Sequence, residues 1–141
     1  MSVRAHVSAI VPCLDEEAAI GACVTALLAH GLGEVIVVDG NSKDRTTERA
    51  ASAGAKVVVE SRKGYGRALA SGIAAVSPRS TILLFIDGDG SDRTALVPAV
   101  LVPIEEGRAD FVLGSRILGE REPGSLEPAQ IVAGRLAGWL I

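Results

Sequence analysis

Short runs of β-branched and other apolar residues alternate along the chain with longer stretches rich in alanine. The apolar runs predict strands at 6–12, 34–39, 56–60, 81–87 and 110–115. Three of these runs, the one at 81–87 among them, are continuously apolar, as expected for strands of a parallel sheet that is covered on both faces. The stretches between the runs place apolar or alanine residues at helical spacing and carry glycine near an end. They predict helices at 16–30, 44–54 and 64–76.

A fourth intervening stretch, 92–107, also predicts a helix, with Asp92 as a candidate cap. Pro98 and Pro103 are expected to kink or split it. Strands and helices in this order predict right-handed crossovers and an α/β fold with a doubly wound, mostly parallel sheet that has helices on both faces. The length of 141 residues fits a single domain, and no repeat or linker interrupts it.

Polar residues follow four of the predicted strands. In a doubly wound sheet the ligand binds beyond the carboxyl ends of the strands, so these residues are expected to share one site. The four polar loops are Pro12–Glu17, Asp39–Asp44, Asp87–Asp89 and Gly114–Arg116.

The loop after the fourth strand reads Asp87-Gly88-Asp89. Two carboxylates one residue apart repel each other, and a bound cation offsets that repulsion. Oxygen ligands suit Mg²⁺ or Mn²⁺, which share phosphate oxygens with a substrate, and Gly88 allows a ligand to approach the backbone closely. The alternative is a solvated turn, because Asp-Gly is also a common turn dipeptide. The position at a strand end favours the metal site.

The loop after the second strand has two interpretations. Asp39 is placed to accept hydrogen bonds from a ribose or a base edge, with Asn41 beside it. Alternatively, the loop is a turn in which Ser42 or Asp44 caps the next helix. We expect both to hold, with Asp44 as the cap and Asp39 as the binding residue. After the first strand, an acidic helix start is favoured by the helix dipole, and Asp15 or Glu16 can also face the ligand.

The segment 61–72 has glycines at 64 and 66 where a helix begins, preceded by Arg62 and Lys63. Backbone N–H groups at such a helix start can hold a phosphate. The segment matches neither the Walker motif nor the dinucleotide fingerprint. Arg116 is an isolated cation that suits a diphosphate, with a surface ion pair as the alternative.

Composition excludes several classes of protein. The net charge of −3 provides no positive electrostatic field that would attract a polyanion, which excludes nucleic acid as a partner. Cys13 and Cys23 form neither a disulfide framework nor a zinc site, which suits a reducing, cytoplasmic location. No run reaches the roughly 20 apolar residues that cross a bilayer. The apolar residues 131–141 predict a helix that contacts the core or a partner, and homo-oligomerisation through this segment is expected.

Taken together, these motifs resemble the family 2 glycosyltransferases of the GT-A fold, and within them the dolichyl- or polyprenyl-phosphate sugar synthases. The resemblance covers residues 8 to about 118, and the chain is expected to be short at its carboxyl end relative to that family. The matching segments, in order, are "SAIVPCLDEEAAI", "VIVVDGNSKDRT", "RKGYGRAL", "FIDGDGSD" and "ADFVLGSRI".

The resemblance implies an inverting, metal-dependent transfer from a nucleoside diphosphate-sugar. It implies that Asp87 and Asp89 hold Mg²⁺ or Mn²⁺ on the diphosphate, with Arg116 nearby. The residues expected to bind the donor are Pro12, Leu14, Glu16, Asp39, Asn41, Lys63, Gly64, Asp87, Gly88, Asp89 and Arg116. A lipid phosphate acceptor is already ionised and needs no general base, and none is identified; such an acceptor places the protein peripherally at the membrane.

Two other functions stay open. One is a module that binds a nucleotide-sugar without transferring it, because the acceptor half of the family is missing. The other is a nucleotidyltransferase, which shares the α/β plan. It is disfavoured because such enzymes carry a Gly-rich, Arg-containing loop after the first strand, where this chain has "PCLDE".

Overall fold

The computed structural model describes residues 4–115, and the chain divides between Ala99 and Val100 into two compact units. The first unit is built on a four-stranded sheet with the order β3-β2-β1-β4, and every neighbouring pair of strands is parallel. The strands are β1 (Arg4–Cys13), β2 (Leu32–Asp39), β3 (Lys56–Val59) and β4 (Ile82–Phe85). The predicted parallel α/β architecture is confirmed.

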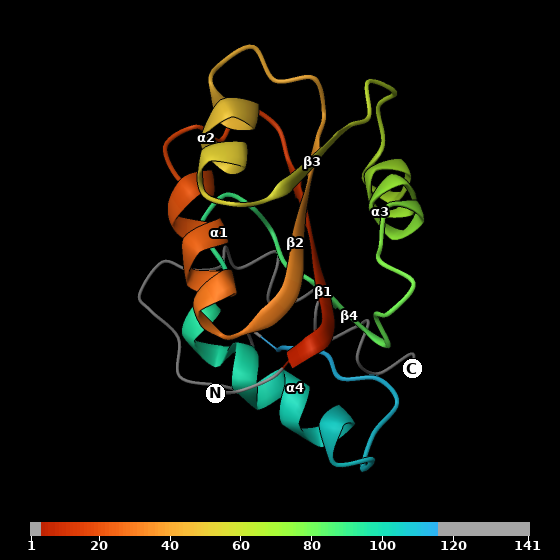
Figure 1. Cartoon of the computed structure of the whole chain (residues 1–141). Helices are drawn as coiled ribbons and strands as arrows, with labels where there is room; N and C mark the ends of the chain where they lie inside the picture. The colour runs from red at the N-terminus through yellow and green to blue at the C-terminus, as the bar shows by residue number, and fades with distance from the viewer. Residues whose placement is uncertain (1–3, 116–141) are drawn as a thin grey trace, which may run out of the picture. The chain divides into compact units, whose positions relative to one another are not determined.

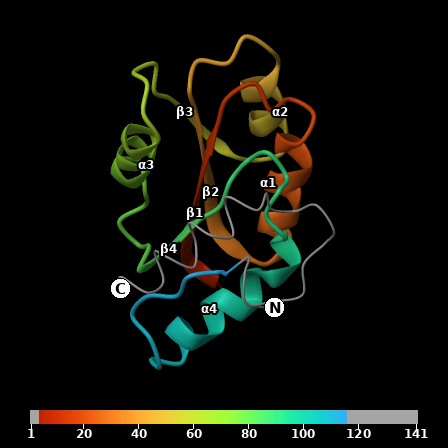
Figure 2. The same ribbon diagram turned by 180° about the vertical axis from the view of Figure 1, so that it is seen from behind.

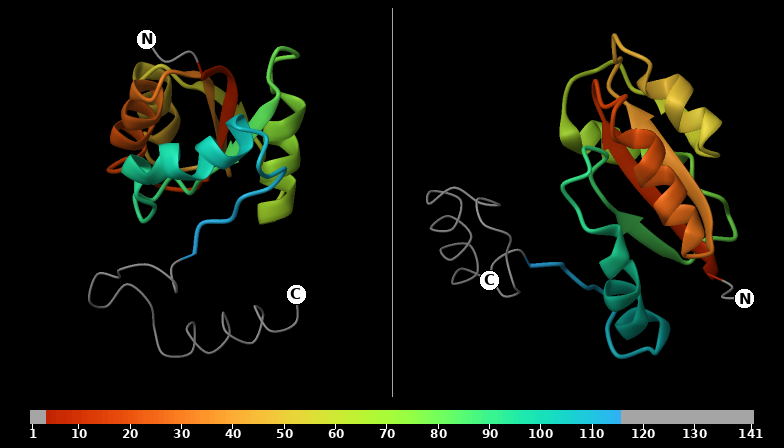
Figure 3. Two further views of the ribbon diagram at one scale, coloured as in Figure 1. Left: turned by 90° about the horizontal axis from the view of Figure 1, so that it is seen from below. Right: turned by 90° about the vertical axis from the view of Figure 1, so that its left-hand side faces the viewer.

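Helices cover both faces of this sheet. Helices α1 (Ile20–Ala29) and α2 (Thr46–Ser52) lie on one face, and α3 (Tyr65–Ala74) lies on the other (Figures 1 and 2). The view from below in Figure 3 shows the same three layers. This alternation is the doubly wound arrangement that the order of the elements predicts.

The core is densest at the two central strands. Val7, Ala9, Ile10 and Val11 of β1 are completely buried, and residues 35–38 of β2 are at most 1% exposed. These strands have neighbours on both edges and helices on both faces, which explains their continuous apolar sequences.

The strand at 81–87 differs from the expectation that it is buried on both faces. In β4, Leu83 is 38% and Phe85 is 43% exposed, and burial alternates along the strand. Among the described residues β4 pairs only with β1, so it is an edge strand. The apolar run at 81–87 therefore predicts the strand correctly, but it does not predict whether both faces of that strand are buried.

Helix α3 approaches the sheet closely because of a glycine. A Cβ atom built on Gly72 lies 2.5 Å from Cγ2 of Ile10 and 3.0 Å from Cγ2 of Val38. Ile10, Ile36 and Val38 form the buried cluster on this side of the sheet. Gly72 thus sets the distance between α3 and the sheet.

The segment 92–107 forms two helical pieces, and the boundary between them lies before Pro98 rather than at either proline. A 3₁₀ turn, η1 (Thr94–Leu96), is followed by α4 (Val97–Glu105), which continues through Pro103. The predicted Asp92 cap is wrong, because Arg93 precedes η1 and Asp92 instead accepts a hydrogen bond from the backbone N–H of Asp87 at 3.0 Å. The Asp92 carboxylate therefore closes the turn that begins at Asp87 instead of capping the helix that follows.

The predicted strand at 110–115 is also wrong. No ladder among the described strands includes it, and Phe111 and Leu113 are each 79% exposed. Alternating apolar residues specify a strand only through the partners on which they pack. Arg116 and the apolar segment 131–141 lie outside the described residues. Within 4–115, no helix has the length and apolar character needed to cross a membrane.

Candidate functional site

The strand order changes direction beside β1. β2 and β3 lie on one side of β1 and β4 lies on the other, so the order reverses between β1 and β4. In doubly wound sheets the ligand binds at this switch point, outside the carboxyl ends of the strands. Cys13 ends β1 and Asp87 follows β4, so the two motifs expected to bind the donor meet here.

Gly88 fixes the turn after β4 against the end of β1. A Cβ atom on Gly88 lies 3.1 Å from Cβ of Cys13, 3.1 Å from Cδ1 of Ile20 and 3.2 Å from Cγ1 of Val11. Gly88 is buried. Its small size is therefore required by packing, which is a different reason from the close approach of a ligand that the sequence suggests.

Asp87 is held by three contacts from three parts of the chain. Its N–H donates to Asp92, and its carbonyl oxygen lies 4.0 Å from the Cys23 thiol of α1, which donates to it. Its Oδ1 accepts a hydrogen bond from the Tyr65 hydroxyl at 3.2 Å. Asp89 is exposed, and its Oδ1 accepts the N–H of Ser91 at 2.8 Å, which closes the turn. The two carboxylates thus differ, one fixed and one at the surface.

The loops after β1 and β2 are tied together by reciprocal hydrogen bonds. The N–H of Asp15 donates to Oγ of Ser42 at 2.8 Å, and the N–H of Lys43 donates to Oδ1 of Asp15 at 2.7 Å. Asp15 has a φ of 53°, in the left-handed region that Asn and Asp tolerate best among non-glycine residues. Two chain segments about 27 residues apart therefore form one structural unit at the rim.

A second set of bonds fixes the start of α2. The N–H of Glu16 donates to Oγ1 of Thr46 at 2.8 Å, and the N–H of Glu17 donates to Oδ2 of Asp44 at 3.1 Å. Asp44 also accepts the N–H of Thr46 at 3.0 Å, although the residue at the cap position is Arg45. The hydrogen bond from the Thr46 hydroxyl is the main cause that lowers the pKa of Asp44. Asp44 thus satisfies a helix N–H from one position before the cap.

Asp39 is a buried carboxylate, only 2% exposed, at the end of β2. Its Oδ2 accepts the N–H groups of Asn41 and Ser42, each at 3.0 Å, and its Oδ1 accepts the Ser42 hydroxyl. Three donors offset the cost of burying the charge. The turn interpretation of this loop is therefore correct, and any role of Asp39 in binding depends on lone pairs left over from the turn.

The start of α3 is a candidate phosphate-binding site, and one of the two cations before it, Arg62, already forms an ion pair. Gly64 precedes α3 with a φ of 133°, and no side chain caps the helix. Lys63 is exposed. Arg62 forms an ion pair with Glu60, whose carboxylate accepts hydrogen bonds from Nε of Arg62 at 2.8 Å and from Nη2 at 2.7 Å. The Arg62 guanidinium is thus directed to Glu60, and Lys63 is the freer of the two predicted cations.

Both thiols beside the site have pKa values raised by their environment. Burial, followed by the charge of Asp39, raises the pKa of Cys13 to about 12, and burial raises that of Cys23 to about 11. Both cysteines are free, which agrees with the absence of a predicted disulfide framework. Cys13 packs against Gly88, and Cys23 contacts the carbonyl oxygen of Asp87.

The carboxylate pair fits a hard divalent cation by its chemistry. Mg²⁺ binds through one or two carboxylates together with substrate phosphates and water. Asp87 and Asp89 supply two such carboxylates, and Asp87 is already oriented. No cluster of three or more His, Cys, Asp or Glu with metal-binding potential occurs within residues 4–115. A cation here would therefore depend on the ligand's own oxygens.

Most of the residues predicted to bind the sugar donor lie at or after the carboxyl ends of the strands. Pro12 pairs with Val38 inside the sheet, and Leu14 is 56% exposed in the loop that follows. Arg116 lies beyond the described residues. Sequence reasoning missed Ser42 as the bridge between the two loops and Tyr65 as a partner of Asp87. For Tyr65 the only sequence signal is its place between the two glycines at the start of α3.

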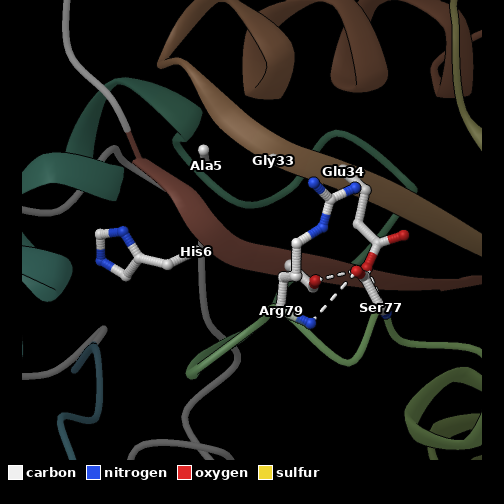
Figure 4. A pocket seen from close by; sticks show the side chains of 7 residues that line it. Ala5, His6, Gly33, Glu34, Ser77 and Arg79 are labelled. Carbon is white, nitrogen blue, oxygen red and sulfur yellow. Dashed lines mark hydrogen bonds between the residues drawn. The ribbon is translucent and has the colours of Figure 1, made fainter.

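A hollow of about 500 Å³ lies at the opposite end of the sheet (Figure 4). It is lined by Ala5, His6, Ser8, Gly33, Glu34, Ser77 and Arg79. Oε1 of Glu34 accepts the hydroxyl of Ser8 at 2.6 Å and the N–H of Ser77 at 2.7 Å. This carboxylate ties together the amino ends of the strands, so we regard the hollow as structural.

Comparison with known proteins shows the family to which the chain belongs. A family model described as glycosyl transferase family 2 matches residues 8–139. The chain therefore belongs to glycosyltransferase family 2, and its fold is of the GT-A type.

Relatives come from bacteria and archaea. An uncharacterized glycosyltransferase of Mycobacterium tuberculosis is 40% identical over 110 residues, which cover 78% of this chain and 48% of that protein. The dolichyl-phosphate hexose transferase of Haloferax volcanii is 34% identical over 131 residues, covering 90% of this chain and 56% of that protein. The chain thus spans about half the length of these relatives.

Solved structures of the glucosyl-3-phosphoglycerate synthase of Mycobacterium tuberculosis share the fold. One of them, in complex with Mn²⁺, UDP and glucosyl-3-phosphoglycerate, is 31% identical with a TM-score of 0.61, covering 70% of this chain and 39% of that chain. Another, with Mg²⁺ and UDP, has the same identity and TM-score and covers 70% and 38%.

Proposed function

We propose that this chain carries the donor site of a metal-dependent, inverting glycosyltransferase that uses a nucleoside diphosphate-sugar. The observation that carries the proposal is the acidic turn Asp87-Gly88-Asp89, which packs against the end of β1 at the switch point of the sheet. The complexes of the related synthase with UDP and Mn²⁺ or Mg²⁺ support it.

The loops after β1 and β2 form the nucleoside side of the proposed site. Exposed Leu14 offers an apolar surface to a base, and Glu16 and Asn41 offer polar groups. Asp39 fixes the loop and presents its remaining lone pairs. Pro12 lies near the end of β1 and directs the chain toward the rim.

The diphosphate side of the proposed site combines cations and backbone. Lys63 and the N–H groups at the uncapped start of α3 beside Gly64 attract the negative charge of the diphosphate. The resemblance of its motif adds Arg116 to the proposal, from outside the described residues. Asp87 and Asp89 would hold Mg²⁺ or Mn²⁺. When bound, the cation stabilises negative charge on the departing nucleoside diphosphate.

Inversion follows from a single displacement. The bond from the acceptor oxygen to the anomeric carbon forms as the bond from that carbon to the diphosphate oxygen breaks. An acceptor phosphate is ionised at neutral pH and requires no base, whereas a hydroxyl acceptor requires one. The relative named dolichyl-phosphate hexose transferase supports a polyprenyl phosphate as the acceptor. With such an acceptor, we expect the reaction to take place at a membrane surface.

Transfer assays with radiolabelled sugar donors test this function. The chain is incubated with UDP-, GDP- or dTDP-sugars, a polyprenyl phosphate and Mn²⁺, and labelled lipid is extracted. We expect metal-dependent product that Asp89→Ala abolishes, while Glu106→Gln, which removes an exposed carboxylate elsewhere, retains activity. Saturable nucleotide-sugar binding without turnover would support a binding module instead. Release of pyrophosphate from a nucleoside triphosphate and a sugar phosphate would support a nucleotidyltransferase.

A further inference from the structure

The hydrogen bond between Tyr65 and Asp87 joins two motifs that are 22 residues apart in the sequence. Tyr65 is the first residue of α3, on one face of the sheet, whereas Cys23, which contacts the carbonyl of Asp87, belongs to α1 on the other face. Asp87 is therefore held from both faces, and Tyr65 is the residue that contacts its carboxylate.

Packing does not explain why a tyrosine stands here. Tyr65 is 60% exposed, so most of its ring lies in solvent and contributes little to the core. Gly64, with its φ of 133°, turns the chain into α3 immediately before it. The specific interaction of this side chain is the hydrogen bond from its hydroxyl to Asp87.

We propose that Tyr65 is a positioning residue that orients the Asp87 carboxylate for the divalent cation, an inference that rests on the proposed function. With Oδ1 accepting the phenol hydrogen, Oδ2 is the oxygen presented to a cation, and it accepts no hydrogen bond among those of the described residues. The terminal torsion of an aspartate is broad and two-fold, so an unrestrained carboxylate must be ordered when it binds. The phenol supplies that order in advance.

Calorimetric titration of Mn²⁺ in the presence of a nucleoside diphosphate measures this effect directly. The nucleotide is whichever of UDP, GDP and dTDP the wild-type chain binds. We expect Tyr65→Phe to weaken Mn²⁺ binding about three- to tenfold, the range of an ordinary hydrogen bond rather than of one to a fully desolvated charge, because the site is partly exposed. Asp87→Asn should weaken it much further.

A matched control separates this effect from the loss of any hydroxyl. Thr25 is exposed on α1, and its hydroxyl donates to the carbonyl of Gly21 in the same helix at 2.9 Å. Thr25→Val should leave Mn²⁺ affinity unchanged. Melting temperatures of all variants without metal establish that each is folded at the temperature of the titration.

A spectroscopic measurement on the otherwise unaltered chain provides an independent test. The sequence contains one tyrosine, so 3-fluorotyrosine labelling gives a single ¹⁹F resonance from position 65. Mg²⁺ with nucleotide should shift this resonance. Paramagnetic Mn²⁺ should broaden it severely, because the cation would lie next to the phenol's partner. Asp87→Asn should remove both effects.

The outcomes separate the two hypotheses. Unchanged or tighter Mn²⁺ binding by Tyr65→Phe, with binding lost in Asp87→Asn, overturns the role of Tyr65 and leaves the donor site intact. The role of Tyr65 is also overturned, with the donor site left intact, if Mn²⁺ leaves the ¹⁹F resonance sharp while calorimetry records binding that Asp87→Asn abolishes. A wild-type chain that binds neither metal nor nucleotide overturns the proposed function and this inference together.

Discussion

Asp39 and Asp44 of the site are held by N–H and hydroxyl donors. Asp39 is nearly buried and accepts two backbone N–H groups and one hydroxyl, all from its own loop. Ser42 has a double role, because its hydroxyl donates to Asp39 and accepts the N–H of Asp15. One side chain therefore links the loops after β1 and β2.

Replacement of Ser42 by alanine tests this link. Ser42→Ala removes both hydrogen bonds and leaves Asp39 with one fewer donor, so we expect the free energy of unfolding to fall by about 1–2 kcal/mol. Urea denaturation measures this change. Ser52→Ala, an exposed serine at the end of α2, should stay within about 0.5 kcal/mol of the wild type. Equal stability of the two variants would show that the link contributes nothing.

Glu60 predicts a dependence of stability on acid pH. Hydrogen bonds from the Arg62 side chain, then from Ser71 and the Arg62 N–H, hold the pKa of Glu60 well below its usual range. A carboxyl whose pKa is lowered on folding contributes stability above its unfolded pKa of about 4.3, and that contribution is lost as the pH falls toward the folded value.

Glu60→Gln should therefore narrow the difference in unfolding free energy between pH 6 and pH 3. Urea titrations at the two pH values measure it for the wild type and the variant. Glu106→Gln, in the exposed pair with Arg108, serves as the control and should retain the full wild-type difference. A Glu60→Gln chain with the same acid sensitivity as the wild type contradicts the prediction.

Single residues of the site were predictable where one chemical property decides their position. The glycine between two acids indicates a tight turn, and the structure adds that Cys13, Ile20 and Val11 leave no space for a Cβ atom at Gly88. Asp92 was misread as a helix cap because local patterns do not show that the N–H of Asp87 competes for it. The contact of Tyr65 with Asp87 requires the packing of α3 on the sheet, which no spacing in the sequence specifies.

At the scale of elements, the sequence predicted the strands and helices best where burial is complete. β1 and β2 are buried on both faces and match their apolar runs within a few residues. β4 and the 110–115 segment show the limit. Apolar character alone does not tell an edge strand from a central one, or a strand from an extended segment outside the described ladders.

Helix α3 allows the same substitution to be tested at two positions with opposite expected signs. Gly66 is exposed, and no atom lies within 4 Å of the position that a Cβ would take, so Gly66→Ala should stabilise the protein by about 0.5–1 kcal/mol through helix propensity. Gly72→Ala places its Cβ 2.5 Å from Ile10, and we expect overpacking to cost about 1–3 kcal/mol.

Thermal and urea unfolding of the two variants measures both changes. Both glycines belong to the same ten-residue helix, so the gain in helix propensity is similar for the two variants. The difference between their stabilities therefore measures the contact of Gly72 with the sheet. Destabilisation by both substitutions would mean that α3 begins after Gly66. Stabilisation by both would mean that α3 lies farther from β1.

At the scale of the whole molecule, one compact unit contains the described donor residues. Asp39, Gly64, Asp87 and Asp89 all precede the division between Ala99 and Val100. A parallel sheet with its switch point at β1 and β4 is enough to gather them, which is why the order of the motifs along the chain predicts the site. The chain spans about half the length of its relatives, and the acceptor side of the reaction stays a proposal.

A ligand that binds the folded chain must also raise its stability. A nucleoside diphosphate-sugar with Mn²⁺ at about 100 times its dissociation constant should add about 2.7 kcal/mol to the free energy of unfolding. Differential scanning fluorimetry with UDP-, GDP- and dTDP-sugars measures the corresponding rise in melting temperature. EDTA should reverse the rise, since the diphosphate alone would face the carboxylates of Asp87 and Asp89 without a cation between them. Asp89→Ala should lose the metal-dependent part while Glu106→Gln keeps it. An equal rise with Mn²⁺ and with EDTA would place the nucleotide away from the acidic turn.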